Sequence, residues 1–194
     1  MFSGIISHTG TVKNADKTRL TISATRGFCG KLQIGTSVAV EGVCLTVVGR
    51  RPNTFTADIM SETNVRTNLG KLFRGSVVNL ELPVTPNTFL SGHLVQGHVD
   101  ISARVARIDR QKEDRVLRFS IPRTLSKYVV GKGSIAVNGV SLTVMSAGQN
   151  HFTVGIIPHT WRTTSMHALK PGDPVNIEVD VIGKYLEKLL KTHA

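Results

Sequence analysis

The chain has 194 residues, of which 40% are hydrophobic, so it can bury a core in one large or two small domains. Its formal net charge of +11 at pH 7 raises the question of a polyanionic partner. However, the basic excess is shared by both halves of the chain, no basic run of five residues occurs, and Trp161 is the single tryptophan, which argues against nucleic-acid binding.

The apolar runs and the cysteines restrict the cellular location. Runs such as 38–40 and 43–48 are far shorter than the roughly 20 residues of a membrane-spanning helix. The first ten residues lack a basic region followed by an apolar stretch, so we expect no secretory signal. Cys29 and Cys44 form neither a disulfide framework nor a metal-ligand spacing. We therefore expect a cytoplasmic protein with reduced thiols and no membrane segment.

From the N-terminus, the chain shows short alternating apolar segments that are rich in Val, Ile and Thr. They lie near residues 10–13, 19–24, 37–48, 54–59 and 77–82, and glycines separate several of them. This pattern predicts β-strands. A brief helical turn is expected after Glu62.

The segment PVTPNTFLSG interrupts the pattern, which then begins again. Residues 37–84 align with residues 134–181 without a gap, and 20 of the 48 positions are identical. Upstream the offset falls from 97 to 93 residues, so the second copy has about four more residues in its first hairpin, where the charged stretch 109–115 lies. An internal repeat of this kind indicates two similar small domains.

Each copy therefore contains about six short strands, and the second copy should have its helical turn after Trp161. A closed barrel is the economical arrangement, because closure removes exposed strand edges. We predict a mainly β protein with two similar six-stranded closed β-barrels in tandem and a C-terminal amphipathic helix. The expected divisions are residues 1–92, 93–181 and 182–194.

The C-terminal segment 181–192 follows a helical period instead. Its apolar face contains Ile182, Tyr185, Leu186, Leu189 and Leu190, and Lys and Glu residues lie opposite. A lone helix of about 12 residues is marginally stable in water, so its apolar stripe needs a partner. The first copy has no equivalent helix, which favours contact between subunits; packing on the chain's own barrel is the alternative.

Eight motifs, in order and from one end of the chain to the other, resemble the riboflavin synthase family. They are MFSGI, GTSVAVEGVCLTV, DIMSETNVRTNLG, SGHLVQGHVD, GKGSIAVNGVSLTV, IIPHTWRTT, VNIEVD and GKYLEKLL. The resemblance implies a homotrimer with two lumazine-binding barrels per subunit and a transferase reaction without a cofactor. Two molecules of 6,7-dimethyl-8-ribityllumazine would give riboflavin and 5-amino-6-(D-ribitylamino)uracil by four-carbon transfer. Lumazine synthase is a candidate protein partner.

The resemblance also places substrate contacts on equivalent segments of the two copies. In the first copy these residues are Gly4, Ile5, Ile6, Cys44, Leu45, Thr46, Asp58, Ile59, Met60, Ser61, Glu62 and Thr63. In the second copy they are Gly97, His98, Val99, Lys132, Ser141, Leu142, Thr143, Gly155, Ile156, Ile157, Pro158, His159 and Thr160. Backbone amides and hydroxyls there can pair with the pyrimidine edge and the ribityl hydroxyls. Two lumazines per site imply that two such walls face each other, and we expect them to come from different subunits.

Cys44, His98 and Ser37 are the candidate catalytic residues. Cys44 breaks the internal symmetry, because Ser141 is its counterpart and a thiolate is the better nucleophile; the alternative is a small apolar strand residue. His98 is also unrepeated, with Ile5 in the matching position, and it can act as a base or hydrogen-bond donor near neutral pH or have a structural role. Ser37 matches a family position near the first pocket.

Other polar residues leave alternatives open. Lys132 can fix a polar edge of the ligand, with Asp180 to orient it, or be an ordinary exposed lysine. His93 and His98 lack a standard metal spacing on a strand, so we expect no metal site. Glu41 stands where the resemblance leads us to expect Asn or another small polar residue.

Two rival functions belong to other classes. A non-catalytic antenna protein of the same fold would bind a lumazine or a flavin, and its cysteine and histidine segments would be eroded. A basic barrel that binds oligonucleotides would show a salt-sensitive affinity. The segments around Cys44 and His98 are intact, which favours the enzyme.

Overall fold

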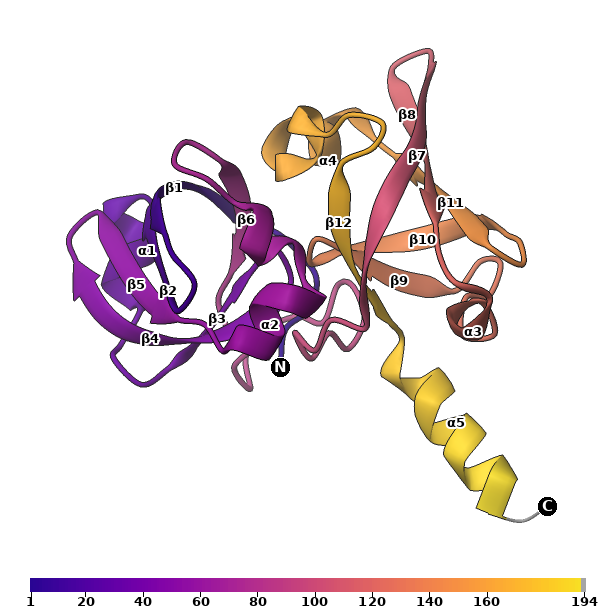
Figure 1. Ribbon diagram of the computed structural model, residues 1–194, viewed down its shortest axis with the longest axis horizontal. Helices are drawn as coiled ribbons and strands as arrows, with labels where there is room; N and C mark the ends of the chain where they lie inside the picture. The colour runs from indigo at the N-terminus through magenta and orange to yellow at the C-terminus, as the bar shows by residue number, and fades with distance from the viewer. Residues whose placement is uncertain (193–194) are drawn as a thin grey trace.

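The computed structural model describes residues 1–192 as two closed antiparallel β-barrels followed by a helix (Figure 1). The first barrel contains β1 (His8–Ala15), β2 (Arg19–Ser23), β3 (Ser37–Val40), β4 (Val43–Arg51), β5 (Thr54–Asp58) and β6 (Val77–Glu81). The second contains β7 (Ile101–Gln111), β8 (Asp114–Ser120), β9 (Ser134–Val137), β10 (Val140–Ala147), β11 (His151–Ile156) and β12 (Pro174–Val179). The strand orders β1-β2-β5-β4-β3-β6 and β7-β8-β11-β10-β9-β12 are equivalent. The predicted tandem of six-stranded barrels is therefore confirmed.

The helices are short except for the last. They are α1 (Arg26–Lys31), α2 (Ser61–Arg66), α3 (Arg123–Ser126), α4 (Pro158–Thr163) and α5 (Val181–Thr192), with 3-10 turns η1 (Asn68–Lys71) and η2 (Ser165–Ala168). The expected turns near Glu62 and Trp161 are α2 and α4. Sequence periodicity missed α1 and α3, because four to six residues are too few to show it. Residues 193–194 of the expected segment 182–194 lie outside the described residues.

Alternate side chains of each strand fill that strand's own barrel. The first core includes Leu20, Ile22 and Phe55, with Phe28 from α1. The second core includes Leu117, Phe119 and Phe152. Fully burying one such side chain contributes roughly 1.5–3 kcal/mol, so each barrel has a separate source of stability.

The segments that precede the two barrels meet between them. Phe2 and Val95 form an isolated antiparallel bridge, in which the amide of Phe2 donates to the carbonyl of Val95 at 2.7 Å and the reverse bond is 3.1 Å. Both side chains are buried, in a third small cluster with Ala39 and Ala136. These four residues occupy paired positions in the repeat, so the cluster lies on the axis that relates the two copies.

A carboxylate in each barrel holds the segment that leads to it. Glu81 of β6 accepts hydrogen bonds from the backbone amides of Ser3 at 2.7 Å and Gly4 at 3.1 Å. Its counterpart Glu178 of β12 accepts from the amide of Gly97 at 2.9 Å. Burial raises the pKa of both carboxyl groups, and the amide donors oppose that rise. These hydrogen bonds to Glu81 and Glu178 fix the position at which each segment crosses to the other barrel.

The hairpin turns β3–β4 and β9–β10 touch back to back. Gly42 and Gly139 have φ of +75° and +79°, and a Cβ on Gly42 would lie 2.5 Å from the amide nitrogen of Gly139. Glu41 and Asn138, which precede them, also have positive φ, as two-residue hairpin turns of this kind require. Only glycine can occupy the second turn position in both copies.

Glu41 is buried in a polar network between the barrels. Its carboxylate accepts from the amide of Asn79 at 2.7 Å, the hydroxyl of Ser165 at 2.8 Å and the side-chain amide of Asn68 at 3.3 Å. Asn138, its counterpart, accepts from the same Asn68 side chain at 3.2 Å. Glu41 thus accepts from both Ser165 and Asn68, whereas the shorter Asn138 accepts from Asn68 and from the amide of Asn176. Burial raises the pKa of Glu41 to about 7.

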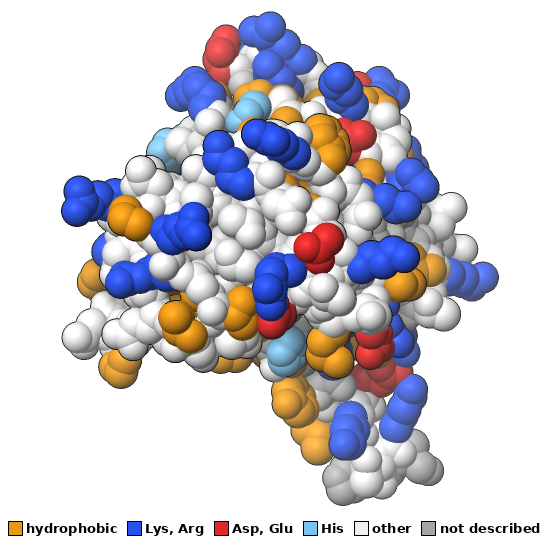
Figure 2. Space-filling model, turned by 60° about the vertical axis from the view of Figure 1, so that its left-hand side comes forward, with side chains coloured by type: hydrophobic (Ala, Val, Ile, Leu, Met, Phe, Trp, Pro, Cys, Tyr) orange, Lys and Arg blue, Asp and Glu red, His pale blue; other side chains and the backbone are white. Residues whose placement is uncertain are grey.

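Helix α5 projects away from the second barrel (Figure 1). Figure 2 shows Lys and Arg side chains dispersed over the barrel surface and apolar side chains on the projecting helix. Within the described part of the chain, no helix combines the length and the apolar character that spanning a membrane demands.

Candidate functional site

The outer face of the first barrel presents a polar row across four strands. Ser37 of β3 pairs with Thr46 of β4, and Thr46 pairs with Asp58 of β5. Arg19 of β2 is opposite Asp58, with its Nε 2.8 Å from Asp58 Oδ1. Directly paired residues point to one face of a sheet, and Cys44, two residues before Thr46, shares that face. We call this row with Cys44 the first wall.

The second barrel has an equivalent surface, in which the counterparts of the first row are uncharged. Ser134 pairs with Thr143, and Ser141 lies two residues before Thr143 on the same face. Gly155 and Val116, the counterparts of Asp58 and Arg19, are paired there. We call this surface the second wall. Its chemistry differs from that of the first wall, since it has a hydroxyl in place of the thiol, and Gly155 and Val116 in place of the Asp58–Arg19 ion pair. The Arg107–Asp109 pair lies one strand further on, where Asp109 is opposite Val116.

Arg19 was not predicted from the sequence. The Arg19–Asp58 pair is exposed and solvent screens it, so it stabilises the fold little, and its clearest effect is to place charge at the edge of the first wall. A position-by-position comparison of the two copies could have found Arg19, because the counterparts of Arg19 and Asp58 in the second copy are uncharged.

The first wall is covered by the start of the second copy. The amide of Cys44 donates to the carbonyl of Gly97 at 2.9 Å, and a Cβ on Gly97 would lie 2.6 Å from Cys44 Cβ. His98 follows directly and is exposed, and Val99 packs against the first core. Cys44 is half-buried beside the cluster of Phe2 and Val95, so it combines an apolar environment with partial access.

The second wall is covered by the start of the first copy. The amide of Ser141 donates to the carbonyl of Gly4 at 2.8 Å, and a Cβ on Gly4 would lie 2.6 Å from Ser141 Cβ. Ile5 is exposed, and Ile6 packs against the second core. The two copies therefore exchange their first residues, and each wall is made from both copies.

His93 is a contact of the second wall that sequence reasoning considered only as a metal ligand. Its Nδ1 lies 2.7 Å from the Oγ of Ser141, and its side chain is buried. Burial lowers the pKa of His93, while the charge of Asp180 opposes that shift. No local pattern in the sequence marks this contact, because Ser141 is 48 residues away in the chain.

Several predicted contact residues have side chains that do not reach either wall. Leu45 and Ile59 fill the first core, and Leu142 and Ile156 fill the second. Only their backbone atoms are available to a ligand. The remaining predicted contacts flank the walls where α2 and α4 begin: Met60, Ser61, Glu62, Thr63, Ile157, Pro158, His159 and Thr160.

Lys132 is exposed and has an unusual backbone conformation. Its φ is +68°, in the left-handed region, where its counterpart Gly35 has φ +88°. A lysine there is strained relative to glycine, and such strain concentrates at functional positions. Its amide donates to the carbonyl of Val144 at 2.9 Å, which holds the turn before β9. The ligand contact of Lys132 stays a prediction.

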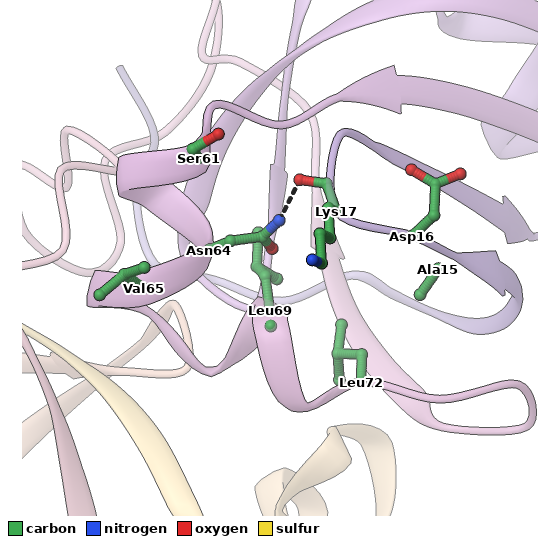
Figure 3. A pocket seen from close by; sticks show the side chains of 9 residues that line it. Ala15, Asp16, Lys17, Ser61, Asn64, Val65, Leu69 and Leu72 are labelled. Carbon is green, nitrogen blue, oxygen red and sulfur yellow. Dashed lines mark hydrogen bonds between the residues drawn. The ribbon is translucent and has the colours of Figure 1, made fainter.

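A separate cavity of about 440 Å³ lies between the β1–β2 turn and α2 (Figure 3). Asn64 reaches from α2 to donate to the carbonyl of Lys17 across it. Its lining shares Ser61 with the predicted contacts but includes neither Cys44 nor Thr46. The two walls are thus outer faces of the barrels and are separate from this cavity.

Comparisons with known proteins agree with this geometry. The lumazine binding domain family matches residues 3–83 and 96–180. The riboflavin synthase of Actinobacillus pleuropneumoniae is 41% identical over 194 residues, covering 98% of this chain and 90% of that protein. The riboflavin synthase of Mycobacterium tuberculosis (strain ATCC 25618 / H37Rv) is 42% identical over 200 residues, covering 99% of both. A crystal structure of LumP complexed with 6,7-dimethyl-8-(1'-D-ribityl) lumazine gives a TM-score of 0.83 at 26% identity, covering 92% of this chain and 99% of LumP.

Two barrels with equivalent walls, each matching the same domain, define a tandem lumazine-binding protein. Within that class, the identity of 41% and 42% with the two synthases exceeds the 26% with LumP. The chain therefore belongs to the riboflavin synthase family of enzymes.

Proposed function

We propose that this enzyme converts two molecules of 6,7-dimethyl-8-ribityllumazine into riboflavin and 5-amino-6-(D-ribitylamino)uracil. One lumazine gives a four-carbon unit and the other receives it. The atoms of the two substrates account for both products, so the reaction consumes no oxidant, reductant or cofactor. One substrate must lose a proton from its C7 methyl group, and the other must accept a nucleophile at C7.

The observation that carries the proposal is the pair of equivalent but chemically different walls. Two identical ligands need two similar surfaces, and the repeat supplies them. The two ligands also react differently, because one loses a proton and the other accepts a nucleophile. The walls differ accordingly, with Cys44 in place of Ser141 and Asp58 in place of Gly155. Holding two reactants in contact can itself contribute on the order of 7–11 kcal/mol of barrier reduction.

The first wall suits the lumazine that is attacked. Cys44, or a water molecule beside it, would add at C7 of this ring, and Ser37 and Thr46 would hydrogen-bond to its polar atoms. His98 follows the glycine that covers Cys44, so it lies beside the same wall and can donate or accept a proton there. The second wall, with Ser141, Thr143 and Lys132, would hold the lumazine that loses its methyl proton.

We further propose that the working assembly is a homotrimer in which the first wall of one subunit faces the second wall of another. Support comes from α5, whose apolar residues Ile182, Tyr185, Leu186, Leu189 and Leu190 are each more than half exposed. The opposite face of α5 is tied to the second barrel: Lys184 lies 2.6 Å from Asp100, and Glu187 contacts Lys127 and Tyr128. The stripe is therefore left free for another subunit.

Two further expectations are proposals of the same kind. Lumazine synthase remains a candidate partner, because it would supply the substrate. A cytoplasmic location is supported by the two cysteines, which are both free thiols.

The direct test is to mix the protein with 6,7-dimethyl-8-ribityllumazine alone and to follow the absorbance of the flavin product. Riboflavin and the ribitylamino-pyrimidine should form in equal amounts. A protein that binds the lumazine tightly but forms no riboflavin would be an antenna protein, and the proposed reaction would be wrong.

A further inference from the structure

A buried histidine is hydrogen-bonded to the second wall. The Nδ1 of His93 lies 2.7 Å from the Oγ of Ser141, and only 8% of His93 is exposed. Among the described residues, its Nε2 is buried without a hydrogen-bond partner. Within residues 1–192, no hydrogen bond joins a histidine to Cys44, the counterpart of Ser141.

The imidazole ring is held in place by close backbone packing. The amide of His93 donates to the carbonyl of Ser3 at 3.2 Å. A Cβ on the neighbouring Gly92 would lie 2.1 Å from that same carbonyl oxygen and 2.8 Å from Ser141 Cβ. The chain at 92–93 therefore rests directly on Ser141 and cannot be moved away without disturbing the start of the first copy.

The unpartnered Nε2 indicates which ring nitrogen of the neutral imidazole carries the hydrogen. A neutral imidazole has one N–H donor and one acceptor nitrogen. Placing the hydrogen on Nε2 would bury an unpaired N–H, and orphaned buried N–H groups are rarer than under-satisfied acceptors. The hydrogen therefore belongs on Nδ1, where it donates to the Oγ of Ser141.

This tautomer determines what Ser141 can offer to a ligand. With a donor already directed at its Oγ, the hydroxyl of Ser141 turns its own single proton elsewhere. Ser141 is half-buried on the second wall, beside Thr143, where a ligand acceptor atom can receive that proton. Cys44, the counterpart, lacks this constraint.

We propose that His93 is a positioning residue: it fixes the hydroxyl of Ser141 as a hydrogen-bond donor toward an oxygen or nitrogen acceptor of the lumazine on the second wall. The proposal rests on the reaction proposed above, because it assigns one of the two bound rings to this wall. It also explains why the two walls treat identical ligands differently.

A pH effect follows from the same geometry. Protonation of His93 would place a charged N–H on the unpartnered Nε2, and burial accordingly lowers the pKa of His93. The charged group that faces His93 is Asp180, next to the start of α5, and its negative charge partly opposes this shift. A protonated ring keeps its Nδ1–H but also buries a charged, unpartnered Nε2–H, and this favours a displaced ring that no longer donates to Ser141. Activity should therefore fall on the acid side as His93 becomes protonated below its ordinary pKa.

The test uses the full-length protein with two substitutions of His93. His93→Asn keeps a side-chain N–H near the position of Nδ1, and His93→Leu removes it. We expect His93→Leu to lower kcat at least tenfold with less than a threefold change in KM, whereas His93→Asn stays within threefold of the wild type and lacks the acid-side fall. Ser141→Ala should lower kcat to a similar degree, and the double variant with His93→Leu should be no worse than either single variant.

A measurement that is independent of turnover separates this inference from the proposed reaction. Nitrogen-15 NMR of the imidazole nitrogens should show His93 as the neutral tautomer with its proton on Nδ1. A proton on Nε2 overturns the inference even if riboflavin is formed. So does a His93→Leu variant with wild-type kcat and an unchanged acid limb, or fully additive losses in the double variant. If the wild type makes no riboflavin, the reaction is refuted, and the tautomer still decides the role of His93.

Discussion

The amide of Cys44 in the first barrel donates a 2.9 Å hydrogen bond to the carbonyl of Gly97, at the start of the second copy. Gly97 has φ +81°, and a Cβ there would lie 2.8 Å from the amide nitrogen of Cys44. We therefore expect Gly97→Ala to push the segment off the first wall and to lower turnover at least tenfold. Gly131→Ala, where a Cβ meets nothing within 4 Å, is the matched control. Steady-state rates of riboflavin formation compare the two variants. Equal rates would show that catalysis does not need the Gly97 segment to cover the first wall.

The two free cysteines should differ in their effect on catalysis. Cys44 lies on the first wall, whereas Cys29 is wholly buried in the first core on α1. Cys44→Ala should cut turnover tenfold or more, which corresponds to about 1.4 kcal/mol or more in activation free energy. Cys29→Ala should leave turnover nearly unchanged while lowering stability slightly. The same kinetic assay measures both, and similar rates for the two variants would remove Cys44 from the mechanism.

The buried carboxyl of Glu41 should make stability depend on pH. Its folded-state pKa of about 7 lies above its ordinary value of 4.5. Its contribution to the free energy of unfolding is therefore complete below pH 4.5 and is lost as the pH rises through about 7. With about 1.4 kcal/mol per pKa unit, the wild type should lose about 3 kcal/mol between pH 4.5 and pH 8 relative to Glu41→Gln. Urea unfolding at both pH values measures this difference.

The exposed Glu113, in the β7–β8 turn, is the control for that comparison. Glu113→Gln should keep the pH dependence of the wild type. If Glu41→Gln also keeps it, Glu41 remains ionised throughout this range and its three hydrogen-bond donors outweigh the effect of burial.

Helix α5 should govern assembly. Deleting residues 183–194 should convert a trimer into monomers and abolish activity, because the exposed apolar stripe would be the subunit contact. Leu186→Lys, within the stripe, should weaken the trimer, whereas Lys188→Ala, outside the stripe, should not. Light scattering gives the mass in each case. A truncated protein that is still trimeric and active would place the subunit contact elsewhere.

The sequence predicted the architecture well because the repeat and the alternating strands are local or periodic signals. It also placed α5, because Ile182 to Leu190 follow a helical period. It missed the exchange of first residues between the copies, because the equivalence of Phe2 and Val95 in the repeat does not indicate that the two residues contact each other. For the same reason it missed Arg19 and His93, whose roles depend on partners 39 and 48 residues away in the chain.

The central claim is that the reacting pair of lumazines lies between the first wall of one subunit and the second wall of another. Thr46 and Thr143 are exposed counterparts on the two walls, so Thr46→Arg and Thr143→Arg should each block one wall and inactivate the enzyme. The two variants are co-expressed with different tags, and mixed trimers are purified through both tags. We expect mixed trimers to regain part of the wild-type rate of riboflavin formation, because some interfaces pair two intact walls. Mixed trimers that form but stay inactive would place both walls of a site within one chain and contradict the account.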